Sequence, residues 1–230
     1  MKPQENLKSK IFKIKQVADY TKSFIIQKPK NFNYIAGQHI FLEISKDNGK
    51  PFSLVSCPNE NFLEFATIIR DNSSFKNKLD KKKIGDELIV SGPYGKFYLE
   101  DEEEAVFIAG GIGITPFMGI IRDVIQNEKD IKLTLLYSNK SEGRAAFKEE
   151  LDLMNERSPN LNLIYTMTEQ EDFDGEHGRI NKEFIESHVS NPEEKSWFIS
   201  GSPGFVQSIS LMLKKEFKIE KIKLDSFGGY

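Results

Sequence analysis

The chain has 230 residues, 38% of them hydrophobic and 29% charged, and its formal net charge at pH 7 is −3. This composition is typical of a globular protein with one large domain or two smaller ones, and it argues against disorder. The single cysteine, Cys57, excludes an internal disulfide and a cluster held by four thiolates of this chain. Three separated histidines show no metal-ligand spacing, so we expect no metal site.

No apolar run approaches the ~20 residues that span a bilayer, and the first ten residues lack the apolar core of a signal peptide. We therefore expect a cytoplasmic protein with no membrane insertion and no nucleic-acid partner. The oligomeric state is left open.

The charge is divided unevenly along the chain. Residues 1–100 carry 17 Lys and Arg against 11 Asp and Glu, a net charge of +6, whereas residues 101–230 carry 15 against 24, a net charge of −9. Either both surfaces are simply solvated, or the basic half docks an acidic partner with the help of long-range attraction.

The sequence pattern of the first hundred residues is typical of short strands. Apolar and β-branched residues alternate or cluster between turn residues, and a helical pattern is found only near Phe75–Lys83. The predicted strands are Ile11–Val17, Lys22–Gln27, His39–Ile44, Phe62–Ile69 and Glu87–Ser91, followed by a turn at Gly92–Gly95. This pattern predicts a small antiparallel β-barrel, closed or nearly so.

From Glu104 the pattern changes to alternating strands and helices, which predicts a parallel sheet with helices on both faces. We therefore expect two domains, residues 1–100 and 101–230. The predicted strands end at Ala109, Tyr137, Tyr165, Ser200 and Leu224, the last two covering Trp197–Ser200 and Ile219–Leu224. The predicted helices are Thr115–Gln126, Gly143–Met154, Asn181–His188 and Pro203–Glu216.

A glycine-rich turn follows the first of these strands, in the segment FIAGGIGITPF from Phe107. Gly110, Gly111 and Gly113 leave the backbone accessible, and Thr115 as N-cap with Pro116 as first helical residue predicts a helix whose N-terminus faces the turn and favours an anion. The dinucleotide fingerprint is incomplete, because Pro116 stands where its third glycine belongs. Nucleotide binding and simple packing both remain open for this turn by itself.

Two further strand ends offer polar groups, where ligands of open parallel sheets bind. Ser138, Asn139 and Lys140, with Arg144 nearby, either hold a 2′-phosphate or are solvated loop residues, so NADPH against NADH stays open. Gly201, Ser202 and Pro203 again combine an N-cap with a proline at the first helical position.

The order of these motifs resembles the ferredoxin–NADP reductase superfamily, in which a flavin-binding barrel precedes a nicotinamide-nucleotide domain. The segment KPFS (Lys50, Pro51, Phe52, Ser53) stands where the family has Arg-x-Tyr/Phe-Ser. The resemblance implies that Phe52 lies against the isoalloxazine, that Ser53 hydrogen-bonds near flavin N5, and that Lys50 replaces the usual phosphate-binding arginine without its bidentate fork.

A second family segment contributes backbone contacts to the flavin and a helix start for its diphosphate. Its counterparts here are Thr67, Ile68, Ile69 and Arg70 on the strand and Ser73, Ser74, Phe75 and Lys76 at the helix start. The family's glycine is absent, but the serines fit a phosphate, so the resemblance implies FAD rather than FMN.

The glycine turn Gly110, Gly111, Ile112, Gly113, Ile114, Thr115 and Pro116 matches the family's loop for the diphosphate of NAD(P)H. Ser200 replaces the family cysteine that contacts the nicotinamide, and Asp225 replaces the terminal glutamate that orients the nicotinamide or passes a proton. By the same resemblance, Tyr230 stacks on the flavin, although an aromatic residue there could simply close the sheet edge.

The resemblance implies a flavoprotein NAD(P)H oxidoreductase that transfers hydride to FAD and then electrons to an external acceptor. The basic first half favours an acidic one-electron carrier, a ferredoxin or flavodoxin. The alternatives are an NAD(P)H-flavin or ferric reductase that uses free flavin or a chelate, and an electron-transfer subunit or nucleotide-responsive module of a larger complex.

Overall fold

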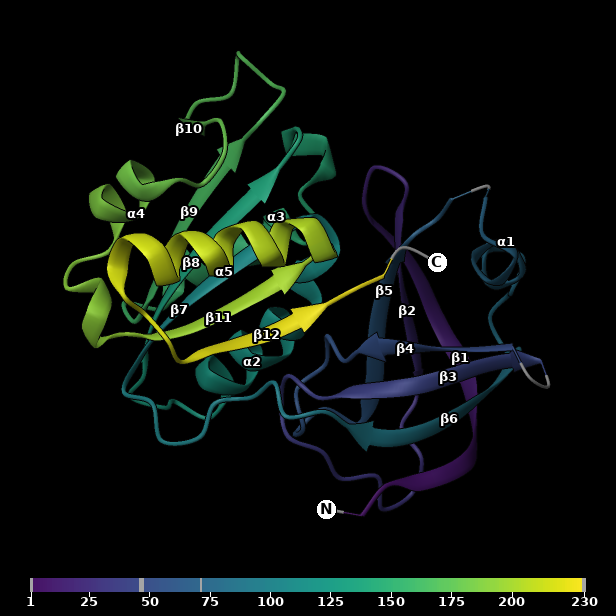
Figure 1. Ribbon diagram of the computed structural model, residues 1–230. Coiled ribbons are helices and arrows are strands. Elements are labelled where there is room, and N and C mark those ends of the chain that lie inside the picture. Colours follow the sequence, from purple (N-terminus) through teal and green to yellow (C-terminus); the bar gives the residue numbers. More distant parts are fainter. Residues whose placement is uncertain (1, 46–47, 71, 229–230) are drawn as a thin grey trace. The chain divides into compact units, whose positions relative to one another are not determined.

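A computed structural model describes residues 2–45, 48–70 and 72–228. Its contacts divide the chain into two compact units, each built on its own sheet (Figure 1). The first unit runs to Leu99 and includes Thr115–Asp123, and the second comprises Glu100–Ile114 and continues from Val124. In the described residues, no helix is both long and apolar enough to cross a bilayer.

The first unit contains a six-stranded sheet in the order β4-β3-β6-β1-β2-β5, and every pairing in it is antiparallel. A backbone hydrogen bond of 2.8 Å from Val55 to Glu64 then joins the segment after β4 to β5, so the sheet curls into the predicted barrel-like form. Its elements are β1 (Gln4–Ala18), β2 (Thr21–Gln27), β3 (His39–Ser45), β4 (Asn48–Ser53), β5 (Phe62–Ile68), α1 (Ser74–Asp80) and β6 (Glu87–Tyr94).

The barrel interior is filled by inward-facing residues, which alternate with outward-facing ones along each strand. Phe24 and Phe65 are fully buried there and stack with their ring centroids 5.2 Å apart. Burying a side chain of this size contributes roughly 1.5–3 kcal/mol, so these aromatic residues fix which face of each strand points inward.

The structure corrects three strand predictions in this unit. β1 begins seven residues earlier than predicted. Its first part was missed because the sequence there is polar: exposed Lys8 and Lys10 flank Ser9, which is buried although it is not apolar. β4 was not predicted, since it contains Pro51, which is tolerated in an edge strand. β6 continues to Tyr94 instead of turning at Gly92.

The second unit contains a six-stranded sheet in the order β10-β9-β8-β7-β11-β12, and every pairing in it is parallel, as the sequence predicted. The sequence predicted neither this strand order nor the two-residue strand β10. Helices α4 and α5 pack on one face, where Ile185 of α4 and Ile209 and Leu213 of α5 share a buried apolar cluster with Ile199 of the sheet. On the other face Tyr165 donates a 2.8 Å hydrogen bond to Asp152 of α3 (Figure 1). The elements that follow Leu99 in the chain, of which α2 contributes Thr115–Asp123 to the first unit, are β7 (Glu104–Gly110), η1 (Gly111–Gly113), α2 (Ile114–Gln126), β8 (Lys132–Asn139), η2 (Glu142–Arg144), α3 (Lys148–Arg157), β9 (Leu161–Met167), β10 (Glu176–His177), α4 (Lys182–His188), η3 (Pro192–Glu194), β11 (Ser196–Gly201), α5 (Pro203–Phe217) and β12 (Ile222–Ser226).

Two element boundaries differ from the prediction because of left-handed residues. Phe147 has a φ of 62°, which separates the short η2 turn from α3, so this helix begins at Lys148 instead of Gly143. Lys218 has a φ of 58° and ends α5, and buried Ile219 belongs to the helix-side core, so the last strand starts at Ile222.

Candidate functional site

The predicted flavin segments lie on β4 and β5, the two outermost strands of the barrel sheet. Directly after β4, the Leu54 N–H donates at 3.0 Å to the carbonyl of Gln38, the residue before β3. Because backbone groups alternate in direction along an antiparallel strand, those of Pro51 and Ser53 point to the outer edge. A proline there costs no ladder hydrogen bond, so KPFS is suited to a strand edge that meets a ligand.

On β5 the outer edge is identified by Glu64, whose carbonyl accepts from Val55 at 2.8 Å and whose N–H donates to Ser56 Oγ at 3.0 Å. By the same alternation, the backbone groups of Ala66 and Ile68 face that edge. No further strand pairs there in the described part of the chain. The sequence identified the neighbouring Thr67 and Ile68 as flavin-binding residues but missed Ala66. The direction in which a backbone group points follows from the pairing of β5 with β2, which the sequence does not show.

The structure brings the KPFS segment and the α1 start together through aromatic contacts. The Phe52 ring lies 5.0 Å from that of Phe65 and 5.7 Å from that of Phe75 on α1. Phe52 is buried in the barrel core by these rings. Its contact with an isoalloxazine stays a prediction.

The predicted helix start at Ser73 is present, with Ser73 Oγ accepting from the Lys76 N–H at 3.4 Å. Lys76 is only 8% exposed. Burial, with the nearby Arg70 guanidinium adding to it, lowers the pKa of Lys76 to about 8. A buried ammonium beside a second cation is stabilised by an anion, and a diphosphate fits that need. Of the other predicted residues, Thr67 is buried, Ser74 and Arg70 are exposed, and Lys50, Ile68 and Ile69 are partly buried.

Ser53 has a neighbour that the sequence did not indicate. It is the cross-strand partner of His39 on β3, so the two side chains leave the same face of the sheet. Burial lowers the pKa of His39, which keeps the imidazole neutral at neutral pH. Only the β3–β4 register reveals this pair, since 14 positions separate its members in the chain.

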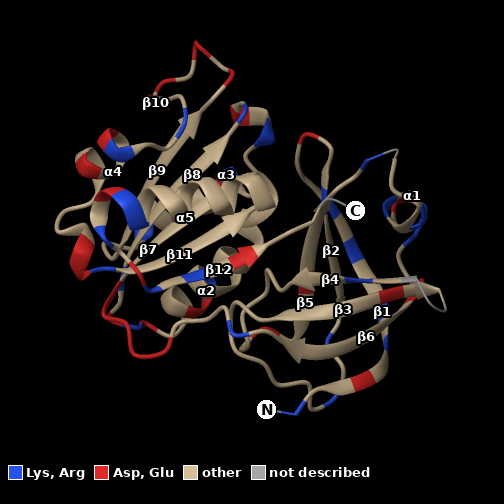
Figure 2. Cartoon of the chain, viewed as in Figure 1, with Lys and Arg blue, Asp and Glu red and all other residues tan. Residues whose placement is uncertain are grey.

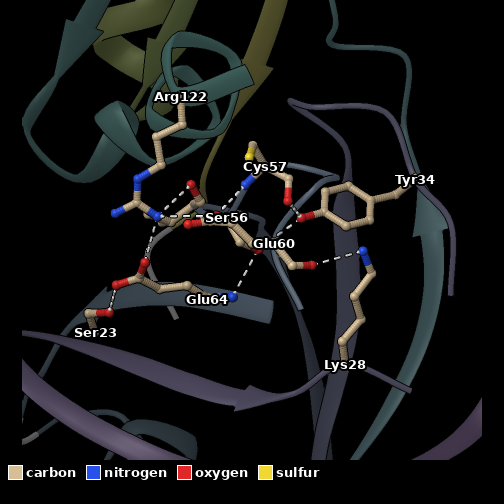
Figure 3. Close-up of polar contacts among 9 residues, drawn as sticks. Ser23, Lys28, Tyr34, Ser56, Cys57, Glu60, Glu64 and Arg122 are labelled. Carbon is tan, nitrogen blue, oxygen red and sulfur yellow. Dashed lines mark hydrogen bonds and ion pairs between the residues drawn. The ribbon is translucent and has the colours of Figure 1, made fainter. Parts of the chain in front are cut away.

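A buried ion pair lies beneath the segment that follows KPFS (Figure 3). Arg122 of α2 is 5% exposed and Glu64 of β5 is 1% exposed. Arg122 Nη1 lies 2.7 Å from Glu64 Oε2 and donates to the Val55 carbonyl at 3.2 Å, while the Ser23 hydroxyl donates to the other carboxylate oxygen. The charges are therefore paired and further hydrogen-bonded, as burial requires.

A second set of bonds holds residues 54–60, which connect β4 to β5 (Figure 3). Tyr34 donates to the Cys57 carbonyl at 2.7 Å, and the Cys57 N–H donates to Glu60 at 2.7 Å. Burial raises the pKa of both Tyr34 and the Cys57 thiol, so these groups serve the fold and stay protonated at neutral pH. In α2, a Cβ at Gly119 would lie 2.7 Å from the Leu54 carbonyl oxygen, so glycine permits the close approach of this helix.

In the second unit the predicted nucleotide residues lie side by side at the carboxyl edge of the sheet. Gly110 pairs with Ser138, and Ser200 pairs with Ala109 on one side and Asp225 on the other. The chain passes from β7 to β8 and β9 and then crosses to β11 on the opposite side of β7. This is the topological switch point at which open α/β sheets bind ligands.

The glycines of the turn have different roles. A Cβ at Gly110 would lie 2.9 Å from the Phe205 ring, and one at Gly113 would lie 2.3 Å from the Ser200 carbonyl oxygen, so both permit packing. Gly111 has a φ of +53°, and a Cβ there would lie more than 4 Å from every described atom. Gly111 is thus the glycine of this turn that is open to a ligand.

The prediction of Thr115 as N-cap is wrong. The chain becomes helical at Gly111 as η1 and continues as α2 from Ile114, so Thr115 and Pro116 lie within the first turn of α2. Pro116 still fits, because the first turn of a helix needs no N–H donor there. The second predicted start is confirmed: Ser202 Oγ accepts from the Phe205 N–H at 3.4 Å, and Pro203 opens α5.

Ser200 is fully buried, and its hydroxyl has no hydrogen-bond partner among the described residues. An unsatisfied buried hydroxyl is costly, so a ligand amide that reaches it would be stabilised. Ser138 and Asn139 are 8% and 5% exposed, which excludes their being solvated loop residues. Lys140 is exposed and pairs with Glu169 at 2.7 Å. Tyr230 lies outside the described residues.

In the described ranges, no three His, Cys, Asp or Glu side chains are placed together to hold a metal ion.

Comparison with known proteins agrees with both halves of this arrangement. A family model described as an FAD-binding domain matches residues 6–98, and one described as an oxidoreductase NAD-binding domain matches residues 107–210. NADH-cytochrome b5 reductase 2 of Mycosarcoma maydis is 30% identical over 173 residues, 72% of this chain and 49% of that protein. A component of the Na(+)-translocating NADH-quinone reductase of Neisseria meningitidis is 33% identical over 157 residues, 64% of this chain and 38% of that protein. The chain thus spans half or less of the length of these curated relatives.

Solved structures share the fold over nearly the whole chain. The flavohem-like FAD/NAD binding domain of nitric oxide dioxygenase from Vibrio cholerae superimposes with a TM-score of 0.86 at 20% identity, covering 98% of this chain and 100% of that one. A ferredoxin NADP+ reductase from Neisseria gonorrhoeae, with bound FAD and NADP, superimposes with a TM-score of 0.82 at 19% identity. The match covers 98% of this chain and 99% of that one. With both domain matches and a sheet for each domain, the chain belongs to the ferredoxin–NADP reductase-like flavoprotein reductases.

Proposed function

We propose that this protein oxidises NAD(P)H by hydride transfer to a bound FAD and passes the electrons to an external acceptor. The observation that carries the proposal is the pair of open strand edges on β4 and β5, which bear the two predicted flavin segments. Bound FAD supplies the chemistry, since it takes two electrons together and releases them one at a time.

The residues of the barrel bind and orient the flavin. Lys50 and Lys76 place cations at the diphosphate, and the outward backbone groups of Ala66 and Ile68 hydrogen-bond the ring system. Ser53, supported by neutral His39, holds a proton at N5. The buried ion pair of Arg122 and Glu64 keeps the segment after Ser53 in place, so the serine does not depend on a mobile loop.

The residues of the second unit hold the nicotinamide nucleotide. Gly111 lets the backbone N–H groups of the turn approach the diphosphate, and Ser202 presents a second helix start across the switch point. Ser200 and Asp225, paired on adjacent strands, orient the nicotinamide through its amide. Productive hydride transfer depends on this alignment, because a displacement of about 1 Å costs on the order of 100-fold in rate.

For the acceptor, we propose an acidic one-electron carrier protein of the ferredoxin or flavodoxin kind. The net charge of +6 on residues 1–100 supports it, since opposite charges accelerate encounter. The second candidate is reduction of free flavin or a ferric chelate. It is supported by the two ligand-binding sheets of this chain, because a small acceptor needs no protein docking surface.

The test of the reaction is the visible spectrum of the purified protein during anaerobic titration with NADPH and then NADH. Bleaching of the flavin band by either nucleotide supports the proposal. A colourless protein that added FAD does not restore would overturn it. If the flavin binds and neither nucleotide reduces it, the chain is an electron-transfer or nucleotide-responsive module.

The dependence of turnover on ionic strength distinguishes the two proposed kinds of acceptor. Turnover with an acidic carrier should fall steeply between low and physiological salt, because screening removes the long-range attraction. Reduction of free flavin in the same buffers should change little. Turnover with the carrier that is insensitive to salt argues for the small acceptor.

A further inference from the structure

Lys140 and Glu169 form an ion pair at the carboxyl edge of the parallel sheet. Lys140 Nζ lies 2.7 Å from Glu169 Oε1, and both side chains are more than half exposed. Their backbones are also joined, since the Glu169 N–H donates to the Lys140 carbonyl at 2.9 Å and the Thr168 N–H donates to that of Asn139 at 2.9 Å. The chain therefore holds the two residues side by side even if the side chains part.

The pair stands where the proposed nucleotide places its adenosine ribose. Gly110, which opens the glycine turn, pairs with Ser138 near the end of β8, two residues before Lys140. When the diphosphate lies at the first glycine turn of a doubly wound sheet, the ribose reaches the end of the next strand. That strand is β8, so the 2′ position of the ribose faces Lys140 and Glu169.

Acidic residues outnumber basic ones around this point, where the nearby cations are Lys140 and the exposed Arg144 of η2. The loop from Glu169 to β10 carries exposed Glu171, Asp172, Asp174 and Glu176 as well, without a lysine or arginine between them (Figure 2). A 2′-phosphate adds close to two negative charges at neutral pH. Lys140, the lysine at the end of β8, already has its charge compensated by Glu169.

We propose that Glu169, by holding Lys140, makes the protein select NADH over NADPH. The inference rests on the proposed function, because it assumes that the nucleotide binds at this sheet edge. A ribose hydroxyl can donate to the Glu169 carboxylate, whereas a phosphate in the same place meets it as a like charge. The selection comes from repulsion as much as from attraction.

The variant that tests this is Glu169→Gln, which keeps the shape and removes the charge. We expect the ratio of kcat/KM for NADPH to that for NADH to rise about fivefold, the scale of one exposed charge pair. Glu171→Gln removes an acid of the same loop and is the matched control, with an expected change in the ratio of under about twofold. Lys140→Met combined with Glu169→Gln should abolish the gain, because the released lysine is what binds the phosphate.

A binding measurement separates this inference from the proposed function. Calorimetric titration with 5′-AMP and 2′,5′-ADP should show that the wild type prefers 5′-AMP and that Glu169→Gln shifts the preference toward 2′,5′-ADP. If neither nucleotide binds and NAD(P)H does not reduce the flavin, the proposed function fails and this inference with it. If both bind and the preference is the same in the wild type and Glu169→Gln, only the inference is overturned.

Discussion

Ser53 on β4 and His39 on β3 are cross-strand partners, so a hydroxyl and a neutral imidazole leave the same face of the barrel sheet. In the proposed reaction Ser53 holds a proton at the flavin, and we propose His39 as the second group with which it exchanges that proton. Ser53→Ala should therefore slow flavin reduction by NAD(P)H by about 100-fold, the lower range for a positioned proton-transfer group. Stopped-flow absorbance of the flavin band measures it.

Ser45→Ala, on the exposed end of β3, is the matched control for Ser53 and should leave the rate of reduction unchanged. His39→Gln should slow the reaction less than Ser53→Ala and alter its pH profile. Equal reduction rates in Ser53→Ala and the wild type would remove Ser53 from the mechanism.

FAD affinity should depend on pH through Lys76. Its pKa in the protein is about 8, and a bound diphosphate favours the charged form. Affinity should thus be constant below pH 8 and fall as the pH rises through 8, by up to about tenfold per pH unit. Fluorescence titration of the apoprotein with FAD measures this, with Lys76→Met expected to flatten the curve and exposed Lys78→Met to preserve it.

The same lysine affects the stability of the apoprotein in the opposite sense. The unfolded chain, with an ordinary pKa of 10.5, binds more protons than the folded one between pH 8 and 10.5. The contribution of Lys76 to the free energy of unfolding therefore increases with pH across that interval. Denaturant unfolding of apo Lys76→Met should lack this increase, and a variant curve parallel to that of the wild type would contradict the assignment.

The ion pair of Arg122 and Glu64 should behave as a buried pair. Arg122→Leu leaves the Glu64 carboxylate uncompensated and should lower the free energy of unfolding by about 3–5 kcal/mol. Adding Glu64→Leu should recover part of that loss, because no charge is then buried. Urea unfolding followed by circular dichroism measures it, with Lys8→Met of the exposed pair with Glu87 as a control that costs less than about 1 kcal/mol.

Two glycines of the nucleotide turn should respond differently to alanine. Gly113→Ala places a Cβ 2.3 Å from the Ser200 carbonyl oxygen and should prevent stable folding of the second unit, measured as a lost thermal transition. Gly111→Ala contacts nothing within 4 Å, so the protein should fold at a cost of about 1–2 kcal/mol for the left-handed backbone. Its NAD(P)H affinity should fall, and undiminished binding would exclude Gly111 from the site.

The unpartnered hydroxyl of Ser200 predicts that its removal weakens nucleotide binding without lowering the stability of the fold. Ser200→Ala should leave the free energy of unfolding of the apoprotein equal to or higher than that of the wild type, because no hydrogen bond to a described residue is lost. Its dissociation constant for NAD(P)H should rise about tenfold, if the hydroxyl binds the nicotinamide amide. A destabilised variant with normal nucleotide binding would show that the serine is structural.

The sequence by itself determined the division into a strand-rich half and a half of alternating strands and helices, and its resemblance to a known family indicated the kind of ligand. Local patterns suffice for the division: the glycine run after an apolar strand, the serine–proline start at Ser202, and strand patterns that give way to alternating strands and helices at Glu104. These signals act over a few residues, through backbone freedom, capping and burial periodicity. The KPFS segment was recognised, but its strand was missed, because a proline opposes a strand everywhere except at an edge.

Tertiary structure decided which groups meet. The pairing of Ser53 with His39, the outward direction of the Ala66 backbone, the contact of Lys140 with Glu169 and the ion pair of Arg122 with Glu64 all depend on strand register or on packing between distant segments. Thr115 illustrates the same limit on a short scale: a good N-cap residue lies inside the helix because Gly111 had already turned the chain. Propensity is local, whereas register and close packing are set by the whole fold.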